Sequence, residues 1–239
     1  MRRGADGQHA PEDIPAFFET AARTGADLVV GNRGLNTGLE ATREQPLELW
    51  FGSFSGQPGP DLIETEWDSV RMRRTVRRRL NELATALPWL PERFSTHRAF
   101  SEAGLADILE GHRDGARRVQ ATTLAVSVFL QRAGRFEPVA LPIEAQFAPV
   151  FGVHVADADG DGNEDVFLAQ NFFANRPETS RHDAGTGLWM LGDGRGGFRP
   201  LSPAESGVDV HGEQRGSAVG DFNGDGRVDL VVSQNGSWT

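Results

Sequence analysis

The sequence predicts an all-β fold built from repeated four-stranded antiparallel units, with a helical insertion in one of them. Three observations lead to this prediction. A nine-residue acidic loop occurs twice, at 157–165 and 221–229, which places the copies 64 residues apart. A short apolar run follows each copy, as a buried strand would. Between them, the glycine-rich segment 192–197 is typical of a hairpin turn. A fixed period of this kind indicates a repeat architecture.

Bulk composition limits the classes of protein to consider. The chain has 239 residues, 29 of them glycine, and a hydrophobic content of 38 %, which is enough for one large or two small β-rich cores. Its net charge of −10 argues against extensive nucleic-acid binding. No apolar run approaches 18 residues, so we expect no membrane span. Met1-Arg2-Arg3 precedes no apolar region, so an export signal, if there is one, lies outside this chain.

The N-terminal part, 1–25, is expected to be a polar segment followed by a short amphipathic helix at 12–23, and 26–239 to form the repeats. A strand is predicted at 27–32, because it matches the apolar runs that follow the two acidic loops. An eroded copy of the unit follows, with its first strand at 47–51, its loop at 53–61 and its hairpin at 128–136.

The eroded copy is longer than the others, and the excess predicts a helical insertion at about 67–118, between its second and third strands. Apolar residues at helical spacing predict one helix over Val70–Leu87. A second helix is predicted over Ser101–Glu110, with Ser101 as its N-cap. Six arginines between 71 and 79 lie on the first predicted helix and form either a solvated face or a site for an anionic partner.

The best-preserved unit has predicted strands at 151–155, 166–170 and 188–191 and a fourth beginning at Phe198, and the next unit starts at Gly216. Four antiparallel strands in 64 residues describe one blade of a β-propeller. The chain has room for about three blades, fewer than the four to eight that close a propeller. We therefore expect a partial propeller, part of a longer chain or an open arc that associates through its edges.

The two acidic loops have the donor pattern that calcium prefers, with side-chain oxygens at positions 1, 3, 5 and 9 and glycines at 4 and 6. Position 7 would donate its backbone carbonyl. The second loop has three carboxylates against four in the first, which predicts weaker binding. Position 12 is apolar in both, which excludes an EF-hand. The loop at 53–61 keeps one carboxylate and is not expected to bind. The predicted calcium ligands are Asp157, Asp159, Asp161, the Asn163 carbonyl and Asp165 in one site, and Asp221, Asn223, Asp225, the Arg227 carbonyl and Asp229 in the other.

Phe151-Gly152, the loop 157–165 and the strand after it together resemble an FG-GAP repeat, also called a VCBS-type repeat, and 216–235 resembles it equally well. The hairpin at 192–198 is similar to those of bacterial members. The resemblance implies an integrin-α-like β-propeller that binds two calcium ions and is secreted, periplasmic or at the cell surface. It implies a binding or scaffolding role toward a protein or carbohydrate, and no catalytic residue. The alternative is a propeller-based lyase or hydrolase whose active site lies in missing blades or in the insertion.

Overall fold

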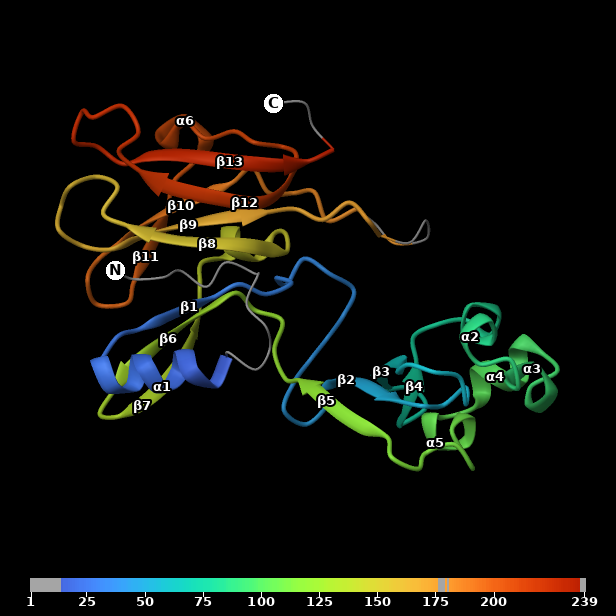
Figure 1. Ribbon diagram of the computed structural model, residues 1–239. Helices are drawn as coiled ribbons and strands as arrows, with labels where there is room; N and C mark the ends of the chain where they lie inside the picture. The colour runs from blue at the N-terminus through green and yellow to red at the C-terminus, as the bar shows by residue number, and fades with distance from the viewer. Residues whose placement is uncertain (1–13, 176–178, 180, 237–239) are drawn as a thin grey trace. The chain divides into compact units, whose positions relative to one another are not determined.

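The computed structural model describes residues 14–175, 179 and 181–236. Its strands form four sheets, and every strand pair is antiparallel, so the chain is mostly β as predicted (Figure 1). The chain divides into two compact units. We call 1–38 together with 124–239 the major unit, and 39–123 the inserted unit because it interrupts the major unit's sequence. The polar segment 1–11 expected at the N-terminus lies outside the described residues.

The major unit contains three sheets, with strand orders β1-β6-β7, β11-β10-β9-β8 and β12-β13. The four-stranded sheet has the order predicted for 150–200. The elements of the major unit are α1 (Ile14–Thr24), β1 (Leu28–Val30), β6 (Ser127–Arg132), β7 (Arg135–Ala140), the 3-10 helix η2 (Ile143–Gln146), β8 (Val150–Ala156), β9 (Asp165–Gln170), β10 (Leu188–Gly192), β11 (Phe198–Pro200), α6 (Pro203–Ser206), β12 (Glu213–Gly220) and β13 (Asp229–Asn235).

The same irregularity occurs in two strand pairs of the major unit. The β8–β9 register shifts between Val150 and Gly152, and the β12–β13 register shifts between Gln214 and Gly216, one 64-residue period later. At Gly152 a Cβ would lie 3.2 Å from the Ala169 side chain, so glycine lets the bulged strand pack closely. The sequence repeat is therefore also a repeat of backbone geometry.

Strand β9 is buried along its whole length because apolar clusters cover both of its faces. Val166 and Leu168 belong to a cluster shared with β6, β8 and β10. Phe167 and Ala169, which point to the other face, pack near side chains of β10, β12 and β13. Full burial of a valine, leucine or phenylalanine side chain stabilises a fold by about 1.5–3 kcal/mol. The four-stranded sheet is thus held between its two neighbours.

One hydrogen bond identifies the repeat to which β1 belongs. Gln131 donates its backbone N–H to Asp27 Oδ1 over 2.5 Å, and Gly192 donates to Asp165 Oδ1 over 2.8 Å. Asp27 therefore corresponds to Asp165, the residue that begins β9. Since β1 pairs with β6 and β6 with β7, the hairpin at 128–136 completes a sheet that starts with β1. The structure differs here from the expected pairing with 47–51.

The inserted unit has its own sheet, with the order β4-β3-β2-β5, and its own apolar core. The first strand, the loop and the second strand of the eroded copy are β2, the 53–61 loop and β3. The next strand of this sheet is β4, not the predicted hairpin at 128–136. Because the whole of 39–123 is compact, the insertion is larger than the predicted 67–118. The elements are β2 (Leu47–Gly52), β3 (Asp61–Asp68), β4 (Arg73–Val76), α2 (Leu80–Ala86), α3 (Leu90–Arg93), α4 (His97–Glu102), α5 (Leu105–Ile108) and β5 (Arg117–Ala121).

The prediction of one helix over Val70–Leu87 was wrong in its first half. Residues 73–76 form β4, which pairs with β3, and the helix begins only at Leu80. The apolar spacing fits a helix, but pairing with a neighbouring strand overrode it, helped by the β-branched pair Thr75-Val76. The second predicted helix is also split. Thr96, rather than Ser101, caps α4 by accepting the Ala99 N–H over 3.1 Å, and extended Gly104 separates α4 from α5.

A buried carboxylate lies on the sheet of the inserted unit. The Glu48 side chain is 2 % exposed and pairs with two guanidinium groups, Arg74 Nε at 3.0 Å and Arg118 Nη1 at 3.1 Å. Gln120 Nε2 and Trp50 Nε1 also donate to it, over 3.0 and 2.8 Å. These donors come from β2, β4 and β5, so Glu48 links three strands.

The arginines between 71 and 79 lie on a turn, on β4 and in the segment between β4 and α2, not on one helical face. Several of them have acidic partners within the inserted unit. Arg71 pairs with Asp68, Arg74 with Glu48, and Arg77 with Glu64 and Glu66. These pairs balance much of the positive charge locally, which weakens the interpretation of this run as an anion site. None of the described helices has the length and apolar character that crossing a membrane requires.

Candidate calcium loops and the opposite end of the strands

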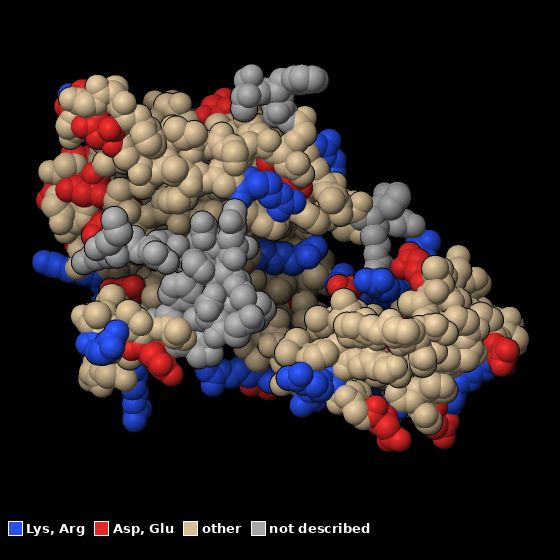
Figure 2. Space-filling model, viewed as in Figure 1, with Lys and Arg blue, Asp and Glu red and all other residues tan. Residues whose placement is uncertain are grey.

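The two predicted calcium loops connect β8 to β9 and β12 to β13, and they lie at the same end of their sheets (Figure 1). Acidic side chains gather at this end of the major unit in the space-filling view (Figure 2). In both loops the strand before and the strand after are paired up to the loop, Ala156 with Asp165 and Gly220 with Asp229. The pairing fixes the two ends of each loop.

In the first loop, aspartate side chains are bonded to the backbone of the loop itself. Asp157 accepts the N–H of Gly160 on Oδ1 over 2.8 Å and the N–H of Gly162 on Oδ2 over 3.0 Å. Asp165 accepts the N–H of Ala158 on Oδ2 over 2.8 Å. These bonds turn the carboxylates at positions 1 and 9 into the loop.

The second loop has the same bonds one period later. Asp221 accepts the N–H of Gly224 over 2.6 Å and that of Gly226 over 2.9 Å, and Asp229 accepts that of Phe222 over 2.8 Å. Because the same backbone groups donate to the same loop positions, the two loop sequences adopt the same local hydrogen-bonded structure. It includes Arg227, whose N–H is donated to Asp225 Oδ1 over 2.9 Å, although its side chain differs from that of Asn163.

The glycines at positions 4 and 6 are required by backbone conformation rather than by space. Their φ angles are +80° and +89° at Gly160 and Gly162, and +79° and +81° at Gly224 and Gly226. A Cβ at any of these four positions would meet no atom within 4 Å. A side chain there would be strained only because L residues disfavour positive φ.

The donor set of the first loop fits a calcium ion. Carboxylate oxygens of Asp157, Asp159 and Asp165 lie within 4.8 Å of one another. Two oxygens that share one calcium ion at about 2.4 Å lie no more than about 4.8 Å apart. Asp161, the fourth predicted carboxylate ligand, is not part of this group. The Asn163 backbone N–H, at 2.7 Å, and the Asn163 side-chain amide, at 2.9 Å, donate to Asp161 within the loop. Each carboxylate oxygen accepts more than one bond, so these bonds do not prevent coordination.

One carboxylate in each loop is stabilised in its charged form by hydrogen bonds from the loop itself. Hydrogen bonds from the Asn163 backbone and side chain lower the pKa of Asp161 below its ordinary value. The backbone N–H of Gly226, followed by those of Gly224 and Asp225, lowers the pKa of Asp221. Hydrogen bonds to an ionised carboxylate favour that form. These bonds keep Asp161 and Asp221 in the deprotonated form that metal binding requires.

The loop at 53–61 in the inserted unit keeps part of this geometry. Asp61 Oδ2 accepts the N–H of Ser55 over 2.6 Å, and Ser55 Oγ accepts the N–H of Gln57 over 3.2 Å. Hydroxyl and amide side chains, however, occupy positions 1, 3 and 5, where the first loop has carboxylates. This donor set suits a calcium ion poorly.

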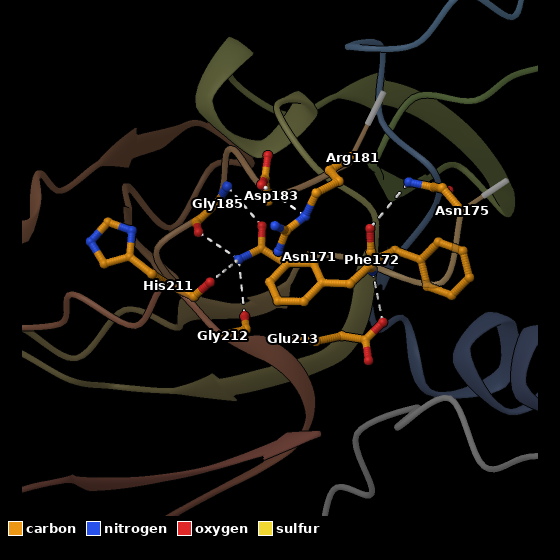
Figure 3. A network of polar contacts seen from close by, with 10 residues as sticks. Asn171, Phe172, Asn175, Arg181, Asp183, Gly185, His211, Gly212 and Glu213 are labelled. Carbon is orange, nitrogen blue, oxygen red and sulfur yellow. Dashed lines mark hydrogen bonds and ion pairs between the residues drawn. The ribbon is translucent and has the colours of Figure 1, made fainter. Parts of the chain in front are cut away.

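A polar network at the opposite end of these strands was not identified from the sequence (Figure 3). Its central residue is Asn171, which directly follows β9 and is fully buried. Asn171 Nδ2 donates to the carbonyls of Gly185, at 2.7 Å, and Gly212, at 3.0 Å, and Oδ1 accepts the Gly185 N–H over 2.8 Å. Its side chain therefore joins two loops. The sequence feature that could have revealed this network is an asparagine at the same place in both repeats, Asn171 and Asn235.

Arginine side chains stack on phenylalanine rings beside this network. The Arg215 guanidinium lies 3.9 Å from the centroid of the Phe151 ring and 5.1 Å from that of Phe172. It also pairs with Glu213 over 2.6 Å, and Glu213 Oε1 accepts the Phe173 N–H over 2.9 Å. Stacked and paired on several sides, Arg215 holds β12 against the segment that follows β9.

His182 is a buried histidine in the same region. The residue is only 5 % accessible to solvent. Its Nε2 atom lies 2.9 Å from Nη2 of Arg33. Burial, and after it the Arg33 charge, lowers the pKa of His182, against opposing effects of the Asn36 backbone and Asp183. Because a guanidinium only donates, the imidazole accepts at Nε2 and is neutral.

We expect the major unit to lose stability as the pH falls through about 6.5, the ordinary pKa of histidine, toward the lower pKa of folded His182. The unfolded chain binds a proton in this range that the folded chain excludes. The measurement is the melting temperature at about pH 7.5 and 5.5. His182→Gln should show a smaller difference than the unsubstituted chain, whereas His211→Gln, at an exposed histidine, should not. Equal pH dependence of all three proteins would contradict this assignment.

Comparisons with known proteins add no relative. The chain matches no protein-family model, no curated protein and no solved structure at a significant level.

Proposed function

We propose that this chain is a calcium-binding β-propeller segment of the FG-GAP type that serves as a binding or scaffolding module. The observation that carries the proposal is the second acidic loop, which repeats the first bond for bond one period later. Turn chemistry alone explains one acidic loop. It does not explain a carboxylate pattern kept twice at the same place in two repeats. It also does not explain why three carboxylates of the first loop have oxygens spaced for one ion.

In this proposal the three sheets of the major unit are successive blades. The four-stranded sheet is one whole blade, and β1-β6-β7 and β12-β13 are parts of its neighbours. Each calcium ion then joins the first and second strands of a blade at one end. The opposite end, with Asn171 and the stacked Arg215, is left for partner binding, because propellers bind ligands on loops that a rigid scaffold presents.

The calcium affinity expected of such loops bears on the location of the protein. Extracellular calcium modules bind with dissociation constants of about 10⁻⁴–10⁻³ M. At about 1 mM calcium and a dissociation constant near 10⁻⁴ M, each ion stabilises the fold by about 1–1.5 kcal/mol. Sites of this strength are filled only where calcium is near millimolar. We therefore propose a secreted, periplasmic or cell-surface protein whose partner is a protein or a carbohydrate.

Removing calcium is expected to lower the melting temperature by about 5–10 °C, because two ions together contribute about 2–3 kcal/mol. The measurement is melting in about 1 mM calcium against excess chelator. The double variant Asp157→Ala with Asp161→Ala should lose more than half of this shift, because it removes ligands of the stronger site. A chain that melts at one temperature with and without calcium would refute the proposal.

A matched control removes two acidic charges elsewhere. Glu102 and Asp209 are exposed side chains outside the loops. The double variant Glu102→Ala with Asp209→Ala changes the net charge by the same amount as the loop variant and should keep the whole calcium shift. A control that lost the shift would indicate a general charge effect instead of two sites.

A further inference from the structure

The inserted unit contains a pocket beside the eroded loop. Its volume is about 260 Å³. It is formed by the start of the 53–61 loop, the residue before α3 and the turn after α5, so three separate segments of this unit converge on it. The lining residues that bear on its chemistry are Ser53, Phe54, Ser55, Trp89, His112 and Asp114.

Two of the lining residues, Trp89 and His112, have rings that stack on each other. The Trp89 indole and the His112 imidazole lie with their centroids 3.9 Å apart and their planes 8° apart. The indole Nε1–H donates to the Phe54 carbonyl over 2.9 Å, and His112 Nδ1 lies 3.2 Å from the Glu110 carbonyl, to which it donates. Both rings are thus fixed by hydrogen bonds before any ligand arrives. Preorganised walls of this kind reduce the entropy lost on binding.

The lining of the pocket also includes hydroxyl groups and one carboxylate. Ser53 and Ser55 occupy positions 1 and 3 of the eroded loop, where the first calcium loop has Asp157 and Asp159. The replacement exchanges charged cation ligands for groups that both donate and accept hydrogen bonds. Asp114, which is exposed, adds an acceptor for two neighbouring hydroxyls.

We propose that this pocket binds one neutral sugar ring of a carbohydrate ligand. A pyranose offers an apolar face for the parts of Trp89 and His112 that line the pocket, and several hydroxyls for the serines and the carboxylate. Pockets for drug-sized molecules measure about 300–1,000 Å³, so about 260 Å³ suits a single ring. An acidic ligand would be repelled by Asp114. The assignment rests on the proposed binding role, and it chooses carbohydrate over protein, but it does not depend on calcium.

The test is a titration with three methyl glycosides, those of glucose, galactose and N-acetylglucosamine, followed by saturation-transfer NMR on the full chain. A single ring of about 13 heavy atoms predicts a Kd on the order of 1 mM for at least one of them. The double variant Ser53→Ala with Asp114→Asn should weaken that binding at least about tenfold, because it removes polar contacts. Glu92→Gln, an exposed change in the same unit, should leave it unchanged.

Two results would overturn the proposal. One is that none of the three glycosides binds the unsubstituted chain at about 20 mM. The other is binding that survives the double variant, which would place the sugar elsewhere. The titration is repeated in excess chelator, where binding should persist. Sugar binding without any calcium-dependent melting shift would support the pocket while refuting the calcium loops, so the two proposals fail separately.

Discussion

Asn171→Asp is expected to lower the free energy of unfolding by about 3–5 kcal/mol, the range for an uncompensated buried charge. The substitution keeps the size of the side chain but replaces the amide that donates to the Gly185 and Gly212 carbonyls by an acceptor. Aspartate tolerates the φ of +86° about as well as asparagine does, so the change acts through the hydrogen bonds. The measurement is urea unfolding at pH 7.

Asn171→Gly is the matched control. It also permits positive φ and removes the same side-chain bonds, but it adds no charge. Its cost should be about 1–3 kcal/mol, the cost of leaving buried polar groups without partners. Equal losses for the two variants would mean that repulsion between the carboxylate and the carbonyls is unimportant. If Asn171→Asp unfolded within about 1 kcal/mol of the unsubstituted chain, the role assigned to Asn171 would be wrong.

Glu48→Ala is expected to destabilise the inserted unit by about 3–5 kcal/mol, because it leaves two guanidinium groups without their buried partner. The Arg74 side chain is 19 % exposed and will bear most of this cost. The Arg118 side chain is 47 % exposed and can turn to water, which places the expectation at the lower end of the range. The measurement is the unfolding of the inserted unit in urea, followed by the fluorescence of its tryptophans.

Glu66→Ala supplies the comparison for Glu48→Ala. Glu66 pairs with Arg77 on the same sheet at 3.4 Å, but its side chain is 42 % exposed. Exposed pairs contribute about 0–1 kcal/mol, so this variant should unfold nearly as the unsubstituted chain does. Similar losses for the two glutamates would contradict the claim that burial makes Glu48 the critical partner.

Local patterns predicted the parts of the fold that depend on local chemistry. The strands around 157–165, the hairpin at 192–197 and the positive φ of the loop glycines all follow from short motifs, and the structure confirms them. The donor oxygens of Asp157, Asp159 and Asp165 are close together as the spacing predicts. Their binding of calcium stays a prediction.

Pairings between distant strands could not be predicted in this way. Leu28 of β1 lies opposite Phe129 of β6, and the inserted unit separates them in the sequence. Nothing in the local pattern of 128–136 distinguishes β1 from 47–51 as its partner. The match between Asp27 and Asp165 indicated that β1 corresponds to β9. This correspondence becomes clear only from the hydrogen bond that each aspartate accepts from the next strand of its sheet. Strand β4 was missed for the same reason, since its pairing with β3 overrode a helical spacing.

The most direct test of the calcium proposal is the number of calcium ions bound per chain, counted by calorimetric titration of the calcium-free protein. Two loops with the same bonds predict two ions, the tighter one at the loop with four carboxylates. Asp157→Ala with Asp161→Ala should leave one, and adding Asp221→Ala with Asp225→Ala should leave none. A folded, unsubstituted chain that binds no calcium at millimolar concentration would contradict the account.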